Sequence, residues 1–470
     1  MTQLLSRASA LLWVTSLVLL VTAPGARAAD SFSSGRYLPA GPVALGGGRL
    51  SWAEYRSDGG FNLRSAQQRA VTLRRRPNRD PRILFTLRLV GSPQGVFSIE
   101  GLSPSKPSDD DLPGQVYGDF LTSFSGAVTR VAPRCGGSGN ADFDGGVMVV
   151  RSCDAMIEVR RVGQSGSSLI RRVPETGIPP SSHYRIAGRY VAYRTSVDRT
   201  GAPSGDDVVI YDWQAGRELY RVAVPAPQLA DLDLQADGKV AFSFIDPSVS
   251  ARAARMQVAW ASPQDPTAHK LPLAPVGSYR VKLDRDRLFF LASSTRFAPA
   301  ELGDLGVTSL AGASRVLARR VIDGVFDVEA DRVAYAVRTC RGPRAVRQSF
   351  AAPTAVGSTR KRCPLRLSGR LRGDRRQRVI VAKLSCLGLA RDCTADRLRV
   401  VLRRRGRVQT LATARYRRGR ARLRARLTRR GARLLRGRRR LRITVVARVS
   451  DSAVGADRTR RTSATLTPSR

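Results

Sequence analysis

The sequence predicts an all-β protein, a β-propeller of about seven blades followed by a C-terminal β-sandwich. Three observations lead to this prediction. A short apolar strand behind a Gly or Asp turn recurs seven times, an Arg-rich segment with strictly alternating apolar residues follows, and no segment between Ser31 and Gln348 has a long helical period. Recurrence at a fixed interval is the signature of repeat architectures, and regular short strands indicate an all-β fold.

The recurring element starts at Leu50, Val96, Val147, Tyr190, Val240, Leu288 and Val333. Successive starts are 43 to 51 residues apart, close to the length of a four-stranded propeller blade. Two stacked β-sandwiches would also produce short strands with regular turns. The regular spacing favours the propeller, with six or eight blades still open as alternatives to seven.

The best-preserved unit predicts all four strands of a blade. They cover residues 183–186, 189–195, 207–212 and 218–224, with a tight turn at Gln214-Ala215-Gly216 between the last two. The turn-then-strand element and the stretch IYDWQAGRELYRV resemble the WD40-like and TolB-type propellers of exported bacterial proteins. The resemblance covers about residues 40–350. It weakens at Asp109-Asp110-Asp111, between Cys135 and Cys153, and in a short seventh unit.

A linker at residues 351–362 precedes a second module at residues 363–468. Ala421, Leu423, Ala425 and Leu427 alternate with arginines, the period of a strand with one face in a core. Residues 379–384, 398–402 and 441–449 predict further strands. Thr428 is the expected cap of a short helix that runs to Leu435 and stops at Gly437.

The pattern of this module resembles the Arg-rich immunoglobulin-like or fibronectin-like β-sandwiches that end many exported actinobacterial proteins. The features that carry the resemblance are the Cys386 and Cys393 pair, the LTRRGARLL helix and the RRLRITVVARVSD strand. Such modules are usually accessory, so the resemblance implies adhesion or spacing and no chemistry.

The first 28 residues have the three parts of a cleavable signal peptide. Arg7 precedes an apolar run from Ala8 to Ala23, and Ala26-Arg27-Ala28 is a small-x-small cleavage site. The run is shorter than the roughly 20 residues of a spanning helix, although a retained anchor is the alternative. We therefore expect a mature chain from Ala29 or Asp30, without a transmembrane segment, that is secreted or associated with the cell envelope.

The six cysteines are even in number, which in an exported chain favours disulfides over metal ligation. The spacing suggests the local pairs Cys135 with Cys153, Cys340 with Cys363, and Cys386 with Cys393. Six cysteines can pair in about fifteen ways, so the connectivity stays open.

The positive charge is concentrated at the C-terminal end. The chain has a net charge of +44, and residues 358–470 contain 37 Arg or Lys against 5 Asp or Glu. The polyanion-contact candidates are Arg403, Arg404, Arg405, Arg438, Arg439 and Arg440. Acidic wall polymers, anionic lipid head groups or extracellular DNA would suit them. Because no aromatic residues interleave as stacking platforms, we expect no sequence-specific nucleic-acid recognition. Codon usage of a high-GC genome would explain the arginines equally well.

No residue is predicted to be catalytic or to bind a cofactor or a metal. The two histidines, His183 and His269, fall in different repeat units, and Ser165 lacks the second Gly of a nucleophile elbow. Asn140, Asp142 and Asp144 copy the first half of a calcium loop, but Arg151 stands where the closing Glu should be. An acidic turn before the strand at Val147 is the favoured interpretation.

These observations indicate an exported noncatalytic binding or scaffold protein. Propeller loops would contact a protein or glycan partner, and the basic sandwich would hold the molecule at an anionic envelope polymer. The alternative is an extracellular hydrolase or lyase with its acid and base among carboxylates in the centre of the propeller, a site that sequence spacing cannot reveal.

Overall fold

The computed structural model describes the chain in segments. They are residues 30–33, 41–56, 59–77, 83–103, 116–131, 141–152, 156–174, 183–197, 205–226, 228–245, 255–274, 276–293, 302–322, 325–339, 342–351, 365–374, 379–386, 393–404, 407–414, 422–436, 440–451 and 456–468.

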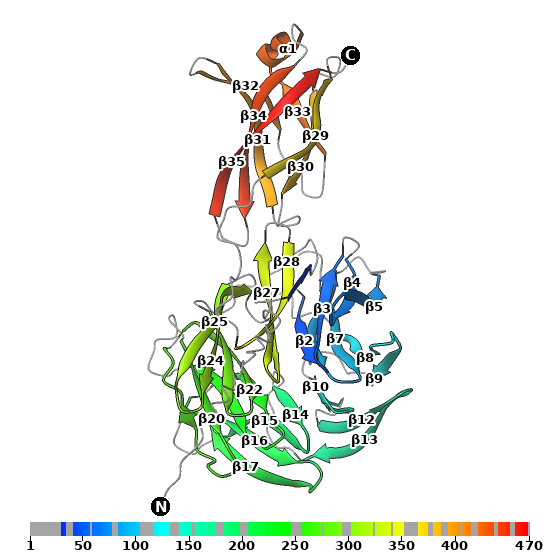
Figure 1. Ribbon diagram of the computed structural model, residues 1–470, viewed down its shortest axis with the longest axis vertical. Coiled ribbons are helices and arrows are strands. Elements are labelled where there is room, and N and C mark those ends of the chain that lie inside the picture. Colours follow the sequence, from blue (N-terminus) through cyan, green and yellow to red (C-terminus); the bar gives the residue numbers. More distant parts are fainter. Residues whose placement is uncertain are drawn as a thin grey trace, which may run out of the picture.

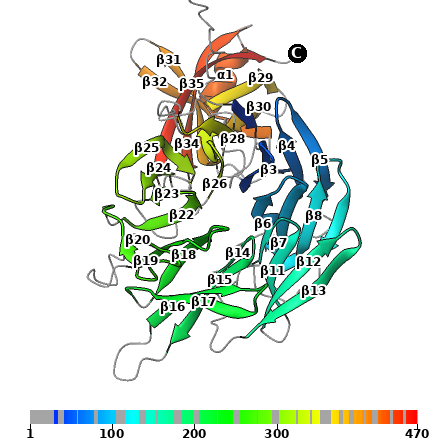
Figure 2. The same cartoon turned by 60° about the horizontal axis from the view of Figure 1, so that its bottom comes forward.

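Seven four-stranded antiparallel sheets form the propeller, and Figures 1 and 2 show them arranged in a ring. The innermost strands are β2 (Val43–Gly46), β6 (Ile83–Gly91), β10 (Ala141–Asp144), β14 (Tyr184–Ala187), β18 (Leu229–Leu234), β22 (Ser278–Asp284) and β26 (Phe326–Glu329). The second strands are β3 (Arg49–Tyr55), β7 (Gly95–Ser103), β11 (Val147–Arg151), β15 (Tyr190–Val197), β19 (Val240–Ile245), β23 (Arg287–Ser293) and β27 (Arg332–Thr339). Each second strand contains one of the seven starts of the recurring element, so the prediction of seven blades is confirmed.

The outer half of each sheet consists of a third and a fourth strand. The third strands are β4 (Phe61–Ala66), β8 (Val116–Ser123), β12 (Ile157–Gly163), β16 (Gly205–Asp212), β20 (Met256–Ala261), β24 (Leu302–Ser309) and β28 (Gly342–Ser349). The outermost strands are β5 (Ala70–Arg76), β9 (Val128–Val131), β13 (Gly166–Val173), β17 (Arg217–Ala223), β21 (His269–Lys270), β25 (Ser314–Ile322) and β1 (Asp30–Ser33). The blade that contains β14 to β17 has the four strands that the sequence predicts.

The outermost strand of the seventh blade comes from the other end of the chain. β1 pairs antiparallel with β28, with Asp30 opposite Arg347, and the same two side chains form an ion pair with 2.8 Å between Nη2 and Oδ2. Phe32 stacks on the buried Trp52 of the first blade with 5.3 Å between ring centroids. The ring is therefore closed by a strand that begins before residue 40, the start expected for the propeller.

The propeller core lies between neighbouring blades, so strands in the middle of a sheet are buried on both faces. β16 is buried over its whole length. Val208 and Ile210 from this strand share a cluster with Phe242 and Phe244 of the next blade. Continuous apolar runs suit such doubly covered strands, which explains why β16 lacks simple alternation.

The C-terminal module is a closed seven-stranded barrel with one helix, coloured from dark yellow through orange to red in Figure 1. Its strands pair in the order β29 (Leu365–Asp374), β30 (Val379–Cys386), β33 (Arg422–Leu427), β32 (Arg407–Ala414), β31 (Cys393–Arg404), β34 (Leu441–Asp451) and β35 (Ala456–Pro468), and β29 pairs in parallel with β35 to close it. The immunoglobulin-like classification of this module stays a prediction.

The predicted helix of the barrel is present as α1 (Arg429–Arg436). The hydroxyl of Thr428 accepts a hydrogen bond from the backbone N–H of Gly431 at 3.0 Å, as an N-cap residue does. Ala425 is buried and Arg426 exposed, so the alternation holds where the structure describes the side chains of β33. The predicted stop at Gly437 lies outside the described residues.

Several predictions concern residues that the structure does not describe. The signal peptide, Asn140, Asp109 to Asp111 and four of the cysteines (Cys135, Cys153, Cys340 and Cys363) belong to this group. In the described part of the chain, the only helix is too short to cross a bilayer.

Candidate functional site

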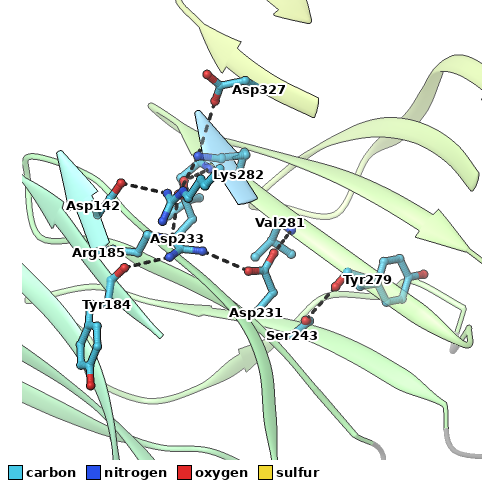
Figure 3. Close-up of polar contacts among 12 residues, drawn as sticks. Asp142, Tyr184, Arg185, Asp231, Asp233, Ser243, Tyr279, Val281, Lys282 and Asp327 are labelled. Atoms are coloured by element: carbon cyan, nitrogen blue, oxygen red, sulfur yellow. Dashed lines mark hydrogen bonds and ion pairs between the residues drawn. The ribbon is translucent and has the colours of Figure 1, made fainter. Parts of the chain in front are cut away.

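The innermost strands of six consecutive blades contribute charged side chains to one cluster at the centre of the propeller. From the second blade to the seventh the sign alternates: Arg88, Asp142, Arg185, Asp233, Lys282 and Asp327. Asp231, two residues before Asp233 on β18, joins them. These seven residues are the central cluster, most of which is drawn in Figure 3. β2 of the first blade carries no charged residue, which lets a ring with an odd number of blades alternate in sign without placing like charges on adjacent strands.

Each cation of the central cluster lies against carboxylates of an adjacent blade. The shortest N···O distances are Arg88–Asp142 2.9 Å, Arg185–Asp231 3.2 Å, Arg185–Asp233 3.9 Å, Lys282–Asp233 3.4 Å and Lys282–Asp327 3.5 Å. Arg185 and Lys282 therefore each bridge two carboxylates. Ion pairs join the second blade to the third and connect the fourth to the seventh in series. Between the third and fourth blades, the backbone N–H of Ile186 binds Asp142 instead.

The same carboxylates also bind the backbone of the next blade. In all four, Oδ1 faces the cations while Oδ2 accepts a backbone N–H. The donors are Ile186 N to Asp142 at 3.1 Å, Val281 N to Asp231 at 3.0 Å, Leu283 N to Asp233 at 2.8 Å and Leu45 N to Asp327 at 2.8 Å. An innermost strand has a sheet neighbour on one side only, so its inward N–H groups need other acceptors. The aspartates supply these acceptors.

Burial and pairing shift the pKa values in the cluster in different directions. Burial opposes ionisation of Asp231, but Arg280 and Arg185 outweigh it and hold the pKa of this carboxyl below its ordinary value. Burial raises the pKa of Asp233 in spite of Lys282 and Arg185. Burial also disfavours the charged form of Lys282, but Asp233 and Asp327 raise its pKa. The ammonium of Lys282 therefore stays charged at neutral pH.

Two carboxyls whose pKa values move apart are the pattern of an acid and base pair in enzymes. In this cluster, however, Asp231 and Asp233 are each 7% exposed, and both oxygens of each already have a cation or an N–H as partner. A general acid or base must reach a proton of the substrate. The arrangement as it stands joins blades, and proton transfer to a substrate would require one of these contacts to break.

The half calcium loop of the sequence is part of this blade-joining pattern. Asp142 and Asp144 lie on β10, before the turn at Gly145 and Gly146. Asp144 Oδ2 accepts the N–H of Gly188 at 2.7 Å, and Asp142 is engaged by Arg88 and Ile186. The acidic residues thus end a strand and do not form a loop. Among the described residues, no three His, Cys, Asp or Glu side chains gather closely enough to hold a metal ion.

The other residues weighed for chemistry lie apart. His183 precedes β14 beside Asp231, and its charge contributes to the low pKa of that carboxyl. His269 is on β21, where its Nε2 lies 2.8 Å from Asp265 Oδ2 and its ring stacks on Trp260. Ser165 is in the turn between β12 and β13. The structure brings none of these three together.

The cysteine and arginine candidates of the barrel are described in part. Cys386 ends β30 and Cys393 begins β31. Their bond and the two other local pairs stay predictions. Arg403 and Arg404 lie at the end of β31, and Arg440 is exposed before β34. Arg405, Arg438 and Arg439 are outside the described residues.

A surface hollow of about 730 Å³ lies where turns of the third, fourth and fifth blades meet. Arg161, Arg189, Gln214 and Trp213 are among the residues that line it. The indole N–H of Trp213 donates to Gly188 O at 3.0 Å, which fixes the ring at the wall. The hollow offers the guanidinium of Arg161 and the amide of Gln214 to a polar partner, whereas Arg189 already pairs with Asp212.

The sequence contains a signal for the central cluster that the calcium hypothesis obscures. In three blades, two acidic residues separated by one apolar residue stand on the innermost strand before the turn: Asp142 and Asp144, Asp231 and Asp233, Asp327 and Glu329. In the seventh blade, Glu329 accepts from Gly47 N at 2.7 Å and from Gly48 N at 2.9 Å. Alignment of the repeat units would have shown that the motif recurs.

Comparisons with known proteins find distant likeness to solved structures and nothing in sequence. No family matches the chain, and no curated protein is similar to it in sequence. Two of the similar solved structures are β-propeller domains. One is from the Trilobed protease of Pyrococcus furiosus, described as having an open velcro topology (TM-score 0.41, 10% identity, 64% of this chain and 90% of that one). The other is from Cps50 (Swd1) of Myceliophteria thermophila (TM-score 0.39, 11% identity, 68% of this chain and 99% of that one).

Proposed function

We propose that the chain is an exported, noncatalytic binding or scaffold protein whose basic barrel holds it at an anionic polymer of the cell envelope. The propeller then presents its turns and loops to a protein or glycan partner, and the hollow between the third, fourth and fifth blades is one such surface. The proposal depends on the number and exposure of the basic residues in the barrel.

The exposure of the barrel arginines carries this proposal. Every barrel arginine whose side chain the structure describes is exposed: Arg399, Arg426, Arg429, Arg430, Arg433, Arg440, Arg442 and Arg461. Residues 352–470 contain 37 Arg or Lys and only 5 Asp or Glu, so most of these cations have no acidic residue within the module to pair with. Exposed guanidinium groups bind phosphate and carboxylate oxygens through two parallel hydrogen bonds.

The alternative is a hydrolase or lyase that uses Asp231 and Asp233. The opposite pKa shifts of these two carboxyls favour it, and their paired oxygens count against it. Glycosidic or ester cleavage by the purified protein that is lost in the Asp233→Asn variant, with folding intact, would replace the binding proposal.

Retention on envelope material tests the proposal. We expect the mature chain to stay bound at about 50 mM salt and to be released by about 500 mM, because counterion release makes binding to a polyanion steeply salt-dependent. A chain that ends at Ser358 should wash off at the lower salt. A full chain with Arg429→Glu, Arg430→Glu and Arg433→Glu should fall between them, since α1 supplies only part of the charge.

The matched control for the helix variant places three glutamates at exposed propeller arginines, Arg217, Arg255 and Arg319, which changes net charge equally. Its retention should stay close to that of the unmodified chain. Equal retention of the full and shortened chains at low salt would refute the role of the barrel.

A further inference from the structure

The exposed aliphatic side chains of the propeller gather on one part of its rim. The large hydrophobic residues that the structure describes as exposed are Val71 at 53%, Val128 at 46%, Leu169 at 45% and, in the barrel, Val408 at 57%. The first three lie on β5, β9 and β13, the outermost strands of the first, second and third blades. Figure 2 shows these blades side by side along one edge of the ring.

The exposed charges on the same three strands are all positive. Arg75, Arg130 and Arg172 are exposed, one on each strand, and the described residues of the three strands include no Asp or Glu. The nearest acidic partners are buried: Glu100 binds Arg74 and Arg76, and Glu158 lies 3.4 Å from Arg172. Elsewhere on the rim, β17 exposes Glu218. β25 exposes Arg315 and Arg319 and has no acidic residue, but none of its large hydrophobic residues is exposed. Among the described residues, the combination of exposed arginines with exposed aliphatic side chains is therefore confined to this part of the propeller.

The three strands also offer backbone groups. Each is the last strand of its sheet and pairs on one side only, so its outer edge presents N–H and C=O groups that an extended chain can pair with. A chain that adds to such an edge uses main-chain hydrogen bonds for affinity and alternate side chains for specificity.

We infer that this rim, formed by β5, β9 and β13, binds an extended acidic polypeptide segment in which carboxylates alternate with aliphatic residues. The carboxylates complement the arginines, and the aliphatic side chains cover Val71, Val128 and Leu169. A wholly hydrophilic polyanion would leave the aliphatic residues exposed. A flat bilayer cannot touch three consecutive blades of a convex ring at once, and a second copy of a chain with net charge +44 is repelled. This surface is separate from the barrel, so it does not depend on the proposed tether.

The test measures binding of a fluorescent peptide with alternating Glu and Val to the full mature chain. The rim variant carries Val71→Thr, Val128→Thr and Leu169→Thr, which removes the aliphatic contacts and leaves net charge and the barrel unchanged. We expect its affinity for the peptide to fall about tenfold, because three partly buried aliphatic contacts are lost. Its affinity for poly-glutamate, which the barrel also binds, should be unchanged.

Val408→Thr is the matched control, the same change at an exposed valine of the barrel, and should bind the peptide as the unmodified chain does. A second variant, Arg75→Gln with Arg130→Gln, should also weaken peptide binding and lower its salt dependence. Unchanged thermal transitions would show that the variants fold. The inference is overturned if the rim variant binds the peptide normally, if it loses poly-glutamate equally, or if only vesicles of phosphatidylglycerol and phosphatidylcholine bind in a rim-dependent way.

Discussion

Charged residues are mostly paired at the centre of the propeller but exposed on the barrel. Residues 30–351 contain 42 Arg or Lys and 32 Asp or Glu, and the innermost strands of six blades place part of this set at the centre with alternating sign, joined by ion pairs between most neighbouring blades. Residues 352–470 contain 37 Arg or Lys in a much shorter stretch and only 5 Asp or Glu, and their described arginines are exposed. Charge in the propeller holds blades together, whereas charge in the barrel is free to contact something else.

The first and second blades are joined in another way, because β2 contributes no charged residue to the central cluster. Between the first and second blades the innermost strands approach so closely at Gly46 and Gly91 that a Cβ on either would overlap the other strand. Farther out, Arg74 and Arg76 of the first blade bind the buried Glu100 of the second, and both lie over the ring of Phe120. Paired charge thus joins these blades too, but near the rim.

Removal of one acid from the centre should have the largest effect. Asp233→Ala leaves Lys282 with one carboxylate and the N–H of Leu283 without its acceptor, so we expect the free energy of unfolding to fall by about 3 kcal/mol. Asp237→Ala is the control on the same blade, because its ion pair with Lys239 is exposed and such pairs contribute less than about 1 kcal/mol. Chemical denaturation of both variants measures the difference, and equal losses would mean that the central pairs are not stabilising.

Loss of the closing strand should have a smaller effect. Phe32→Ala removes the stacking on Trp52 that fixes β1 against the first blade, and we expect about 2 kcal/mol of destabilisation for this partly buried ring. Hydrogen exchange should then rise at the amides of β28. Ser31→Ala is the control, because it keeps the backbone carbonyl that Arg344 binds. Unchanged exchange in the Phe32 variant would show that β1 is held by the backbone alone.

Acidification should reveal whether the pKa of Asp231 is lowered or raised in the folded state. Because Arg280 and Arg185 overcome the effect of burial and depress its pKa in the folded state, its contribution is full above about pH 4 and is lost as the pH falls through the lower folded value. The stability difference between the unmodified chain and Asp231→Asn should therefore shrink below about pH 4. Denaturation at a series of pH values measures it. A difference that grows with acidification would mean that the pKa is raised.

Much of the fold follows from local sequence. The second strands form behind Gly or Asp turns and repeat at a blade's interval, so their number and position are predictable from the pattern. β1 is not, because it is a four-residue strand whose partner Arg347 is 317 positions away. Such a pairing leaves no local period. The barrel strands β29 and β35 were also missed, since each contains three arginines among few apolar residues. β32 was missed because a register shift buries the adjacent residues Leu411 and Ala412 and breaks its alternation.

The site was less accessible to sequence reasoning. Asp142 and Asp144 were seen but compared with a calcium loop, because one repeat unit by itself does not show that acids recur before the turn in two other blades. Arg88, Arg185 and Lys282 lie among many other basic residues, and only the ring brings them to the same place. Which rim residues are exposed depends on which face of an outermost strand the neighbouring blade covers. The sequence of one strand does not contain this information.

The salt dependence of binding to a soluble polyanion tests the central claim most directly. Fluorescent polyphosphate should bind the full mature chain with a steep linear decrease of log affinity against log salt, and the slope counts the phosphates neutralised. The chain that ends at Ser358 should show weaker binding with a much shallower slope, because acidic residues offset most of its cations. Equal slopes for the two chains would contradict the account, since the propeller would then hold as much available positive charge as the barrel.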